Sequence, residues 1–275
     1  MRAGLQAWAR DAGRELRLAD DESDPGSAVR LHREFLAAGC CPVLGPYGSD
    51  TARAVALNGG GGPLWNHGAA ADDVQQLPGV VSVPTPSSRY LLAVARAAVE
   101  LHGASRIAVL TAPGRFARFA RDGLERQAAT LAARLVRDPD DADCILLCGG
   151  LEWESKRFRE LERPGVVFGG VSPGLPSAPD AWPDGALAPV QWHPDLGGPP
   201  RIADYVAAQA YAAALLAERC LELDATDPLA AARMLSTTTF FGRFELDENG
   251  LQVGHRLSVV RWRAGRQELL VADAA

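Results

Sequence analysis

The chain has almost no lysine, little sulfur and no long apolar run. Lys156 is the only lysine among 28 basic residues, and 34 acidic residues give a net charge of −6. An acidic protein is a poor partner for nucleic acid or for an anionic membrane surface. No stretch reaches the roughly 18 apolar residues of a membrane span. The sequence therefore predicts a protein that neither binds nucleic acid nor spans a membrane.

The five cysteines and five histidines follow no metal-binding pattern. Cys40 and Cys41 are adjacent, Cys144 and Cys148 lie in one apolar run, and Cys220 stands alone. None of these spacings is the CxxC of zinc or thioredoxin-like sites, and no HExxH occurs. We interpret the cysteines as small buried apolar residues, and we expect no metal and no cofactor.

Strand-like apolar runs alternate with amphipathic helical ones, which is typical of an α/β fold with parallel sheets. A chain of 275 residues is long enough for two such lobes. Strands are expected at 14–20, 41–46, 63–69, 80–84, 106–112, 142–150, 164–171 and 186–192, before a terminal hairpin. Helices are expected at 4–12, 27–39, 49–59, 87–103, 115–133, 153–163, 202–223 and 227–235.

Two motifs carry a family resemblance when they are taken in order. The first, LGPYGSDTARAVA at 44–56, is a strand ending in Gly-Pro, a small-hydroxyl cluster and a helix. The second follows DPLAAARML and reads TTTFFGRFELDENGLQVGHRLSVVRWRAGR at 237–266. The chain resembles the Leu/Ile/Val-binding type I periplasmic binding proteins, which are substrate-binding components of ABC transporters. The resemblance covers nearly the whole chain.

This resemblance implies a two-lobe fold of parallel sheets flanked by helices, with a ligand in the cleft. Lobe 1 is expected at 1–112, completed by part of 202–275, and lobe 2 at 113–201 with part of the terminal hairpin. It implies a binding protein that is not an enzyme, with a small-molecule ligand and an ABC permease as partners. The expected ligand is partly apolar and carries a carboxylate or an amide.

The family places a strand and a ligand loop before the first helix, but here Met1–Gly4 leads straight into it. Because that strand lies mid-sheet, its absence should leave two strand edges apart and make lobe 1 the less regular one. A signal peptide is also missing from the start. The expected location is periplasmic if an upstream signal was trimmed or missed, and otherwise cytoplasmic.

Nine residues fall where the resemblance implies ligand contacts. In lobe 1, hydroxyls and amides at a helix start suit a carboxylate, and in lobe 2 aromatic rings cover the ligand's body. Ser172 stands where amino-acid-binding members carry an acid, so a free α-amino acid is disfavoured as ligand. The candidate residues are Tyr47, Ser49, Thr51, Gly68, Ala69, Ala70, Phe116, Trp153 and Ser172.

Other interpretations stay open beside this one. Gly170–Gly174 fits the G-x-S-x-G elbow of α/β-hydrolases, but Pro173 cannot supply the main-chain N–H of an oxyanion hole. A cytoplasmic ligand-sensing regulatory domain of the same fold is the main alternative function. A degenerate member that binds nothing is the third possibility.

Overall fold

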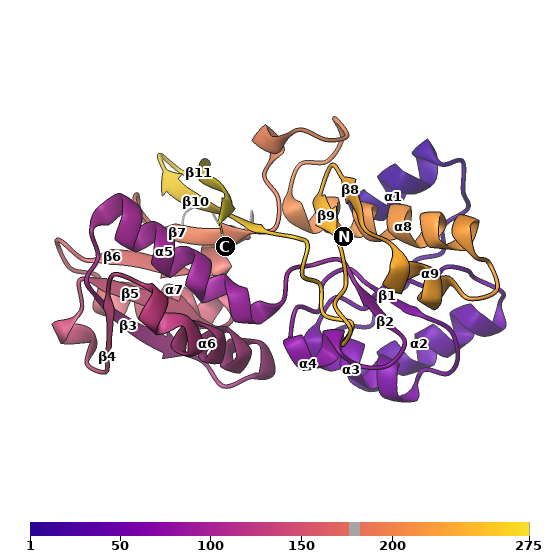
Figure 1. The fold of residues 1–275 in the computed structure, drawn as a ribbon, viewed down its shortest axis with the longest axis horizontal. Coiled ribbons are helices and arrows are strands. Elements are labelled where there is room, and N and C mark those ends of the chain that lie inside the picture. Colours follow the sequence, from indigo (N-terminus) through magenta and orange to yellow (C-terminus); the bar gives the residue numbers. More distant parts are fainter. Residues whose placement is uncertain (176–181, 275) are drawn as a thin grey trace. The chain divides into compact units, whose positions relative to one another are not determined.

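The computed structural model describes residues 1–175 and 182–274 and divides into two compact units (Figure 1). Unit 1 comprises Met1–Pro86 and Leu196–His255, and unit 2 comprises Ser87–Asp195 and Arg256–Ala275. The chain therefore passes from the first unit to the second at residue 87, whereas the sequence places the lobe boundary at 112.

The sheet of unit 1 is short. Strand β1 (Leu64–Asn66) pairs in parallel with β2 (Val80–Ser82). Leu44 adds one parallel bridge to Trp65 in place of the strand expected at 41–46. The prediction of a strand at 14–20 is wrong, because this segment has no regular secondary structure. An isolated strand has no partner for its main-chain groups, so a suitable sequence alone does not form one.

Helices cover both faces of this small sheet. Helices α1 (Arg2–Asp11) and α8 (Tyr205–Leu223) lie on one side, and α2 (Pro25–Ala37), α3 (Ser49–Asn58) and α4 (Asp72–Gln75) on the other (Figure 1). Asp204 caps α8 by accepting the Ala207 N–H at 2.7 Å. The unit ends in α9 (Pro228–Met234) and a hairpin of β8 (Thr237–Thr239) and β9 (Gly242–Phe244).

Unit 2 contains a mixed seven-stranded sheet in the order β11-β10-β7-β6-β5-β3-β4. The strands from β3 to β7 run parallel, and β10 and β11 join antiparallel. Their bounds are β3 (Arg106–Thr111), β4 (Arg134–Val136), β5 (Cys144–Cys148), β6 (Val167–Gly170), β7 (Leu187–Val190), β10 (Leu257–Arg263) and β11 (Arg266–Ala274). The prediction that the first lobe is the less regular one is confirmed.

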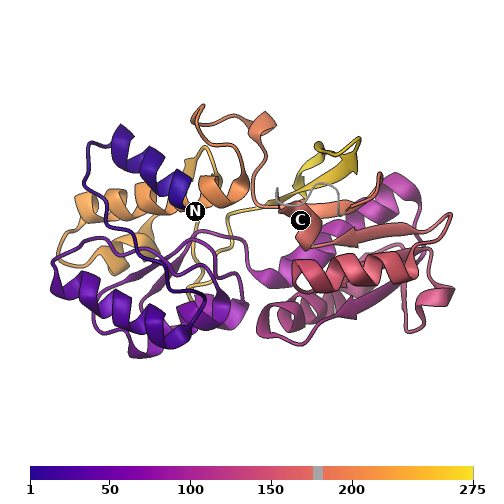
Figure 2. The ribbon, with the colours of Figure 1, turned by 180° about the vertical axis from the view of Figure 1, so that it is seen from behind.

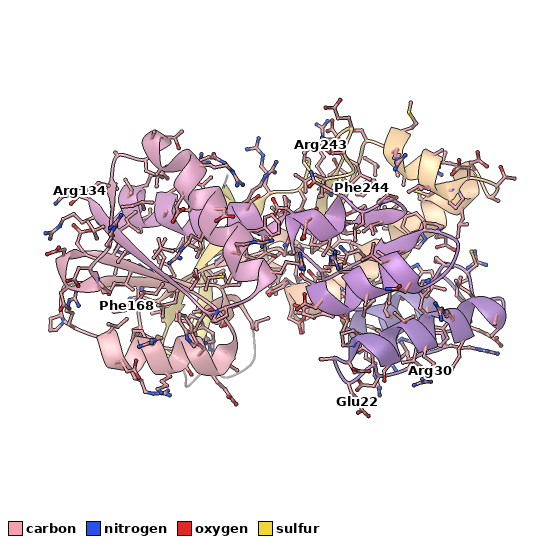
Figure 3. The ribbon with its side chains drawn as sticks, turned by 90° about the horizontal axis from the view of Figure 1, so that it is seen from below. Glu22, Arg30, Arg134, Phe168, Arg243 and Phe244 are labelled. Atoms are coloured by element: carbon pink, nitrogen blue, oxygen red, sulfur yellow. The ribbon has the colours of Figure 1, made fainter. Side chains whose placement is uncertain are left out.

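Three helices flank the sheet of unit 2. Helices α5 (Tyr90–His102) and α6 (Arg115–Gln127) cover one face, and α7 (Leu151–Leu161) covers the other (Figure 2). Helix α6 ends six residues earlier than expected. Phe158 of α7 meets Phe168 of β6 edge to face, with ring centroids 4.9 Å apart. Figure 3 labels Phe168 among the side chains of unit 2. This two-sided burial explains the continuous apolar run that predicted β5.

The cysteine interpretation holds for three of the five residues. Cys144, Cys148 and Cys220 are buried, but Cys41 is exposed and Cys40 is only partly covered. Cys40 and Cys41 lie in the irregular segment before Leu44, where no complete strand forms. Among the helices described, none is both long and apolar enough to cross a bilayer.

We expect Gly4→Ala to destabilise unit 1, because α1 and α8 approach each other closely at this position. A Cβ on Gly4 would lie 2.0 Å from the Ala207 carbonyl oxygen. Forcing the helices apart should cost about 1–3 kcal/mol, more than the helix propensity that alanine adds. Thermal unfolding measures the change.

Gly61→Ala is the matched control for this experiment, because a Cβ at Gly61 meets nothing within 4 Å. Equal melting temperatures for the two variants would contradict the close approach of the helices.

Candidate functional site

The two predicted ligand loops of unit 1 lie side by side. They follow Leu44 and β1, whose carboxyl ends share one edge of the sheet because the segments are parallel. The Ser49 hydroxyl oxygen accepts the Ala71 N–H at 3.3 Å, which ties the start of α3 to the second loop. Residues 45–51 and 67–71 therefore form one continuous edge of unit 1.

Asn66, at the end of β1, organises the second loop. Its Nδ2 donates to the Ala69 carbonyl at 2.7 Å and to the Ser82 hydroxyl at 2.8 Å. Its Oδ1 accepts the N–H groups of Gly68 at 3.1 Å and Ala69 at 2.8 Å. The Gly68 and Ala69 amides, proposed from the sequence for the ligand, are thus already engaged. Sequence reasoning missed Asn66, although a polar residue closing an apolar strand is a usable signal.

Three other donors remain open at this edge. Thr51 Oγ1 gives its hydrogen to the Gly48 carbonyl at 2.9 Å, whereas the Ser49 hydroxyl only accepts and keeps its hydrogen. No residue of the described chain accepts the main-chain N–H of Thr51 or of Ala70. Gly48, which precedes α3, offers no side-chain cap. The N-terminus of α3 can therefore face an anion or a carbonyl oxygen.

Tyr47 packs within unit 1. A Cβ on Gly68 would lie 2.3 Å from Tyr47 Cδ2, so the ring occupies the space that a side chain there would need. The Tyr47 hydroxyl hydrogen-bonds with Tyr205 and Gln209, and burial raises its pKa. His67 is also buried, which lowers its pKa to about 4 and keeps it neutral. This geometry makes Tyr47 a support for the second loop.

In unit 2 the three candidates follow the carboxyl ends of β3, β5 and β6. Phe116 is the second residue of α6 and is half-buried, and its ring meets Tyr90 edge to face with the centroids 5.1 Å apart. Trp153, in the first turn of α7, lies against Gly149, where a Cβ would come within 2.7 Å of its Cε3. Ser172 is 2% exposed and follows β6. The structure thus brings all three to one edge of the large sheet.

Glu154 joins two of these loops and was missed by sequence reasoning. Its Oε1 accepts the Gly149 N–H at 2.7 Å, and its Oε2 accepts the Ser172 N–H at 2.9 Å. The residue is 0% exposed, and a Cβ on Gly170 would lie 2.5 Å from Oε2. A glutamate in a charged helix is ordinarily solvent-exposed, so the sequence carried no clear signal. Glu154 is therefore a positioning residue for residues 149 and 172.

Burial decides the charge of Glu154. Desolvation raises its pKa to about 8, although the N–H groups of Gly149 and Ser172 act in the opposite direction. The carboxyl group is therefore mostly protonated at neutral pH. With both oxygens turned to main-chain donors, it does not present a negative charge beside Ser172.

The arrangement offers hydrogen-bond donors and aromatic rings. Within residues 1–175 and 182–274, no three His, Cys, Asp or Glu side chains come together as a metal site. The Ser172 hydroxyl lies 3.5 Å from the Gly149 carbonyl oxygen and also hydrogen-bonds with the Glu154 carboxyl group. These features suit reversible binding of a small polar molecule.

Solved structures share this architecture. A leucine-binding protein, LivK, from Thermotoga maritima has a TM-score of 0.80 and 16% identity, covering 98% of this chain and 92% of that one. A solute-binding protein of an ABC transporter from Rhodopseudomonas palustris, in complex with 3,4-dihydroxybenzoic acid, has a TM-score of 0.81 and 15% identity, covering 100% and 92%. LivJ from Streptococcus pneumoniae, in complex with isoleucine, has a TM-score of 0.79 and 14% identity, covering 98% and 94%.

Comparisons by sequence find no match to this chain, neither among protein-family models nor among curated proteins. At such low identity the structural likeness shows the fold. The chain has the two-lobe type I periplasmic-binding-protein fold, so the fold predicted from the sequence is confirmed.

The buried Glu154 generates a pH-dependent stability. Its pKa is about 8 in the folded chain and about 4.3 when unfolded. The folded state therefore holds this proton more tightly, and the stability it contributes below pH 4 is lost as pH rises towards 8. The loss is on the order of 1.4 kcal/mol for each unit by which the pKa is raised. Thermal melts from pH 5 to 9 should show it.

Glu154→Gln should flatten this decline, because an amide does not titrate in the range. Glu152→Gln is the control, since Glu152 is an exposed neighbour on the same helix turn. Parallel pH profiles for the wild type and Glu154→Gln would contradict a proton held at Glu154.

Proposed function

We propose that this chain is a non-enzymatic solute-binding protein of an ABC importer. The observation that carries the proposal is the set of open donors at one edge of unit 1, namely the Ser49 hydroxyl and the N–H groups of Thr51 and Ala70. The fold supports it, since solved structures that share it include solute-binding proteins of ABC transporters. The proposal implies that the protein acts outside the cytoplasmic membrane and delivers its ligand to a permease.

We assign to this site a small, partly apolar ligand with a carboxylate or amide head. Ser49, Thr51 and Ala70 supply donors for two oxygen atoms, which matches the acceptor capacity of a carboxylate. Phe116 and Trp153 are the side chains proposed to contact the apolar body. Two solved structures of similar fold, in complex with 4-hydroxybenzoate and with 3,4-dihydroxybenzoic acid, support a carboxylate with an apolar body as the ligand.

The surroundings of Ser172 disfavour a free α-amino acid. An ammonium group removed from water needs a negative partner, or the complex bears a large desolvation cost. Ser172 has no charge, and the adjacent Glu154 is fully buried with both oxygens engaged. Even though LivJ is in complex with isoleucine, this chain should prefer ligands that lack the ammonium group.

A ligand panel tests this preference. We expect 4-hydroxybenzoate and 3,4-dihydroxybenzoate to bind at least tenfold more tightly than leucine or isoleucine, because the acids lack the unpaired ammonium. Thermal-shift screening followed by calorimetry, with short amides included, gives the affinities. Tight leucine binding would show that another group meets the ammonium and would overturn the role given to Ser172.

The donor assignment is tested by removing one hydroxyl. Ser49→Ala should weaken binding of the best carboxylate about tenfold, which corresponds to 1.4 kcal/mol and is typical of one charge-assisted hydrogen bond. Thr130→Ala is the control, because the exposed Thr130 hydroxyl donates only to the Gln127 carbonyl and Thr130 is not a candidate residue. If calorimetry shows the same affinity for Ser49→Ala as for the wild type, the assignment of Ser49 as a ligand donor is wrong.

A further inference from the structure

The turn that carries Ser172 has a hydrogen-bond partner for every main-chain group. It forms η4 (Ser172–Gly174), which is buried. The Ser172 carbonyl accepts the Leu175 N–H at 3.0 Å, and the Gly174 N–H donates to the Val171 carbonyl at 3.0 Å. The Ser172 N–H donates to a carboxyl group of α7. The last two carbonyl groups of the turn find their partners in a distant part of the chain.

The terminal hairpin supplies these partners through two side chains. Trp262 Nε1 donates to the Pro173 carbonyl at 2.7 Å. Gln267 Nε2 donates to the same carbonyl at 2.7 Å and to the Gly174 carbonyl at 3.1 Å. A carbonyl oxygen accepts two hydrogen bonds, so the acceptor capacity of Pro173 is filled. Because Trp262 is 3% exposed, its N–H depends on this carbonyl as a partner.

The register of the hairpin explains why both side chains reach one carbonyl. Strands β10 and β11 run antiparallel, and Trp262 lies directly opposite Gln267. Opposite residues of an antiparallel pair direct their side chains to the same face. A slip of one residue would turn a side chain to the other face. Because β10 also pairs with β7, the hairpin is fixed to the large sheet (Figure 1).

Pro173 connects these contacts to Ser172. The proline ring fixes φ, so few free torsions separate the Pro173 carbonyl from the Ser172 side chain. Gly174 restricts the other end of the turn, because a Cβ there would lie 2.4 Å from the Pro189 carbonyl oxygen. A displacement of the Pro173 carbonyl would therefore move Ser172 as well.

The same pairing limits what the turn can offer to a solute. Its main-chain groups are engaged within unit 2, so the side chain of Ser172 is the polar group of this turn that can meet a ligand. We propose that Trp262 and Gln267 are positioning residues of the solute site, which fix Ser172 by binding the Pro173 carbonyl. This inference rests on the proposed function. It extends the site to a residue 89 positions further along the chain.

The expected effect on affinity follows from preorganisation. A group that is already fixed loses no conformational freedom when the ligand binds, whereas a mobile group must first be ordered. Without the Gln267 donor, the Pro173 carbonyl keeps one partner and the Gly174 carbonyl loses its own. The turn should then be mobile in the free protein, and the solute should bind more weakly.

The test replaces Gln267 by methionine, which has a similar length and no charge but lacks the N–H donors. Gln267→Met should weaken binding of 4-hydroxybenzoate and of 3,4-dihydroxybenzoate about threefold to tenfold, as expected for ordering one or two groups. Calorimetry on the full chain measures the affinities. Gln127→Met is the matched control, because Gln127 is an exposed glutamine of the same unit, and its affinity should equal that of the wild type.

A second substitution restores the donors. Gln267→Lys keeps N–H groups that can donate to both carbonyls. Its affinity should return to within about twofold of the wild type, with Gln127→Lys as the control for the added charge. Hydrogen exchange of the Ser172 and Gly174 amides in the free protein should be faster in Gln267→Met, and unchanged in Gln267→Lys.

The outcomes separate positioning from a purely structural role. If Gln267→Met lowers the melting temperature and speeds exchange, but binds both acids as tightly as the wild type, the residue serves only the fold and the proposal is wrong. Equal loss of affinity in Gln267→Met and Gln267→Lys would also overturn it, because the donors would then not matter. A wild type that binds neither acid would instead contradict the ligand assignment, and the positioning role with it.

Discussion

Main-chain N–H groups at the carboxyl ends of parallel strands constrain both units of this protein. Where such loops are buried, each N–H needs an acceptor, because leaving it unpaired costs as much as a lost hydrogen bond. Asn66 meets this need in unit 1 by accepting the N–H groups of Gly68 and Ala69. Glu154 does the same in unit 2 for Gly149 and Ser172. One buried side chain in each unit thus sets the shape of its loops.

This requirement also determines which groups are left for a solute. Donors that already form hydrogen bonds within the protein cannot bind a ligand at the same time. The Gly68 and Ala69 N–H groups are therefore excluded as ligand donors, whereas the Ser49 hydroxyl and the Ala70 N–H are available. The same logic applies to charge. Glu154 is fully buried and desolvation raises its pKa to about 8, so at neutral pH it serves as a structural acceptor and offers little charge to a ligand.

The sequence predicts elements well where local pattern and long-range pairing agree. The apolar run at 142–150 becomes β5 because strands lie on both sides of it and helices cover both faces. The segment 14–20 has an equally good strand pattern but no neighbour, and it stays irregular. The ligand loops could be located by their order along the chain, whereas Asn66 and Glu154 could not be identified, because their roles depend on which loops the fold places around them.

The two organising side chains differ in one physical respect, which makes the units unequal. The Asn66 amide does not titrate, so the hydrogen bonds that it accepts from Gly68 and Ala69 do not depend on an ionisation of its own. Glu154 changes charge near pH 8, because burial raises its pKa to that value. When Glu154 ionises, the hydrogen bonds that it accepts become stronger, but the cost of keeping its charge away from water rises. Both effects act on Gly149 and Ser172, whose N–H groups it accepts. Ionisation of Glu154 therefore acts on two loops of unit 2 at once, because the N–H groups of Gly149 and Ser172 share its carboxyl group.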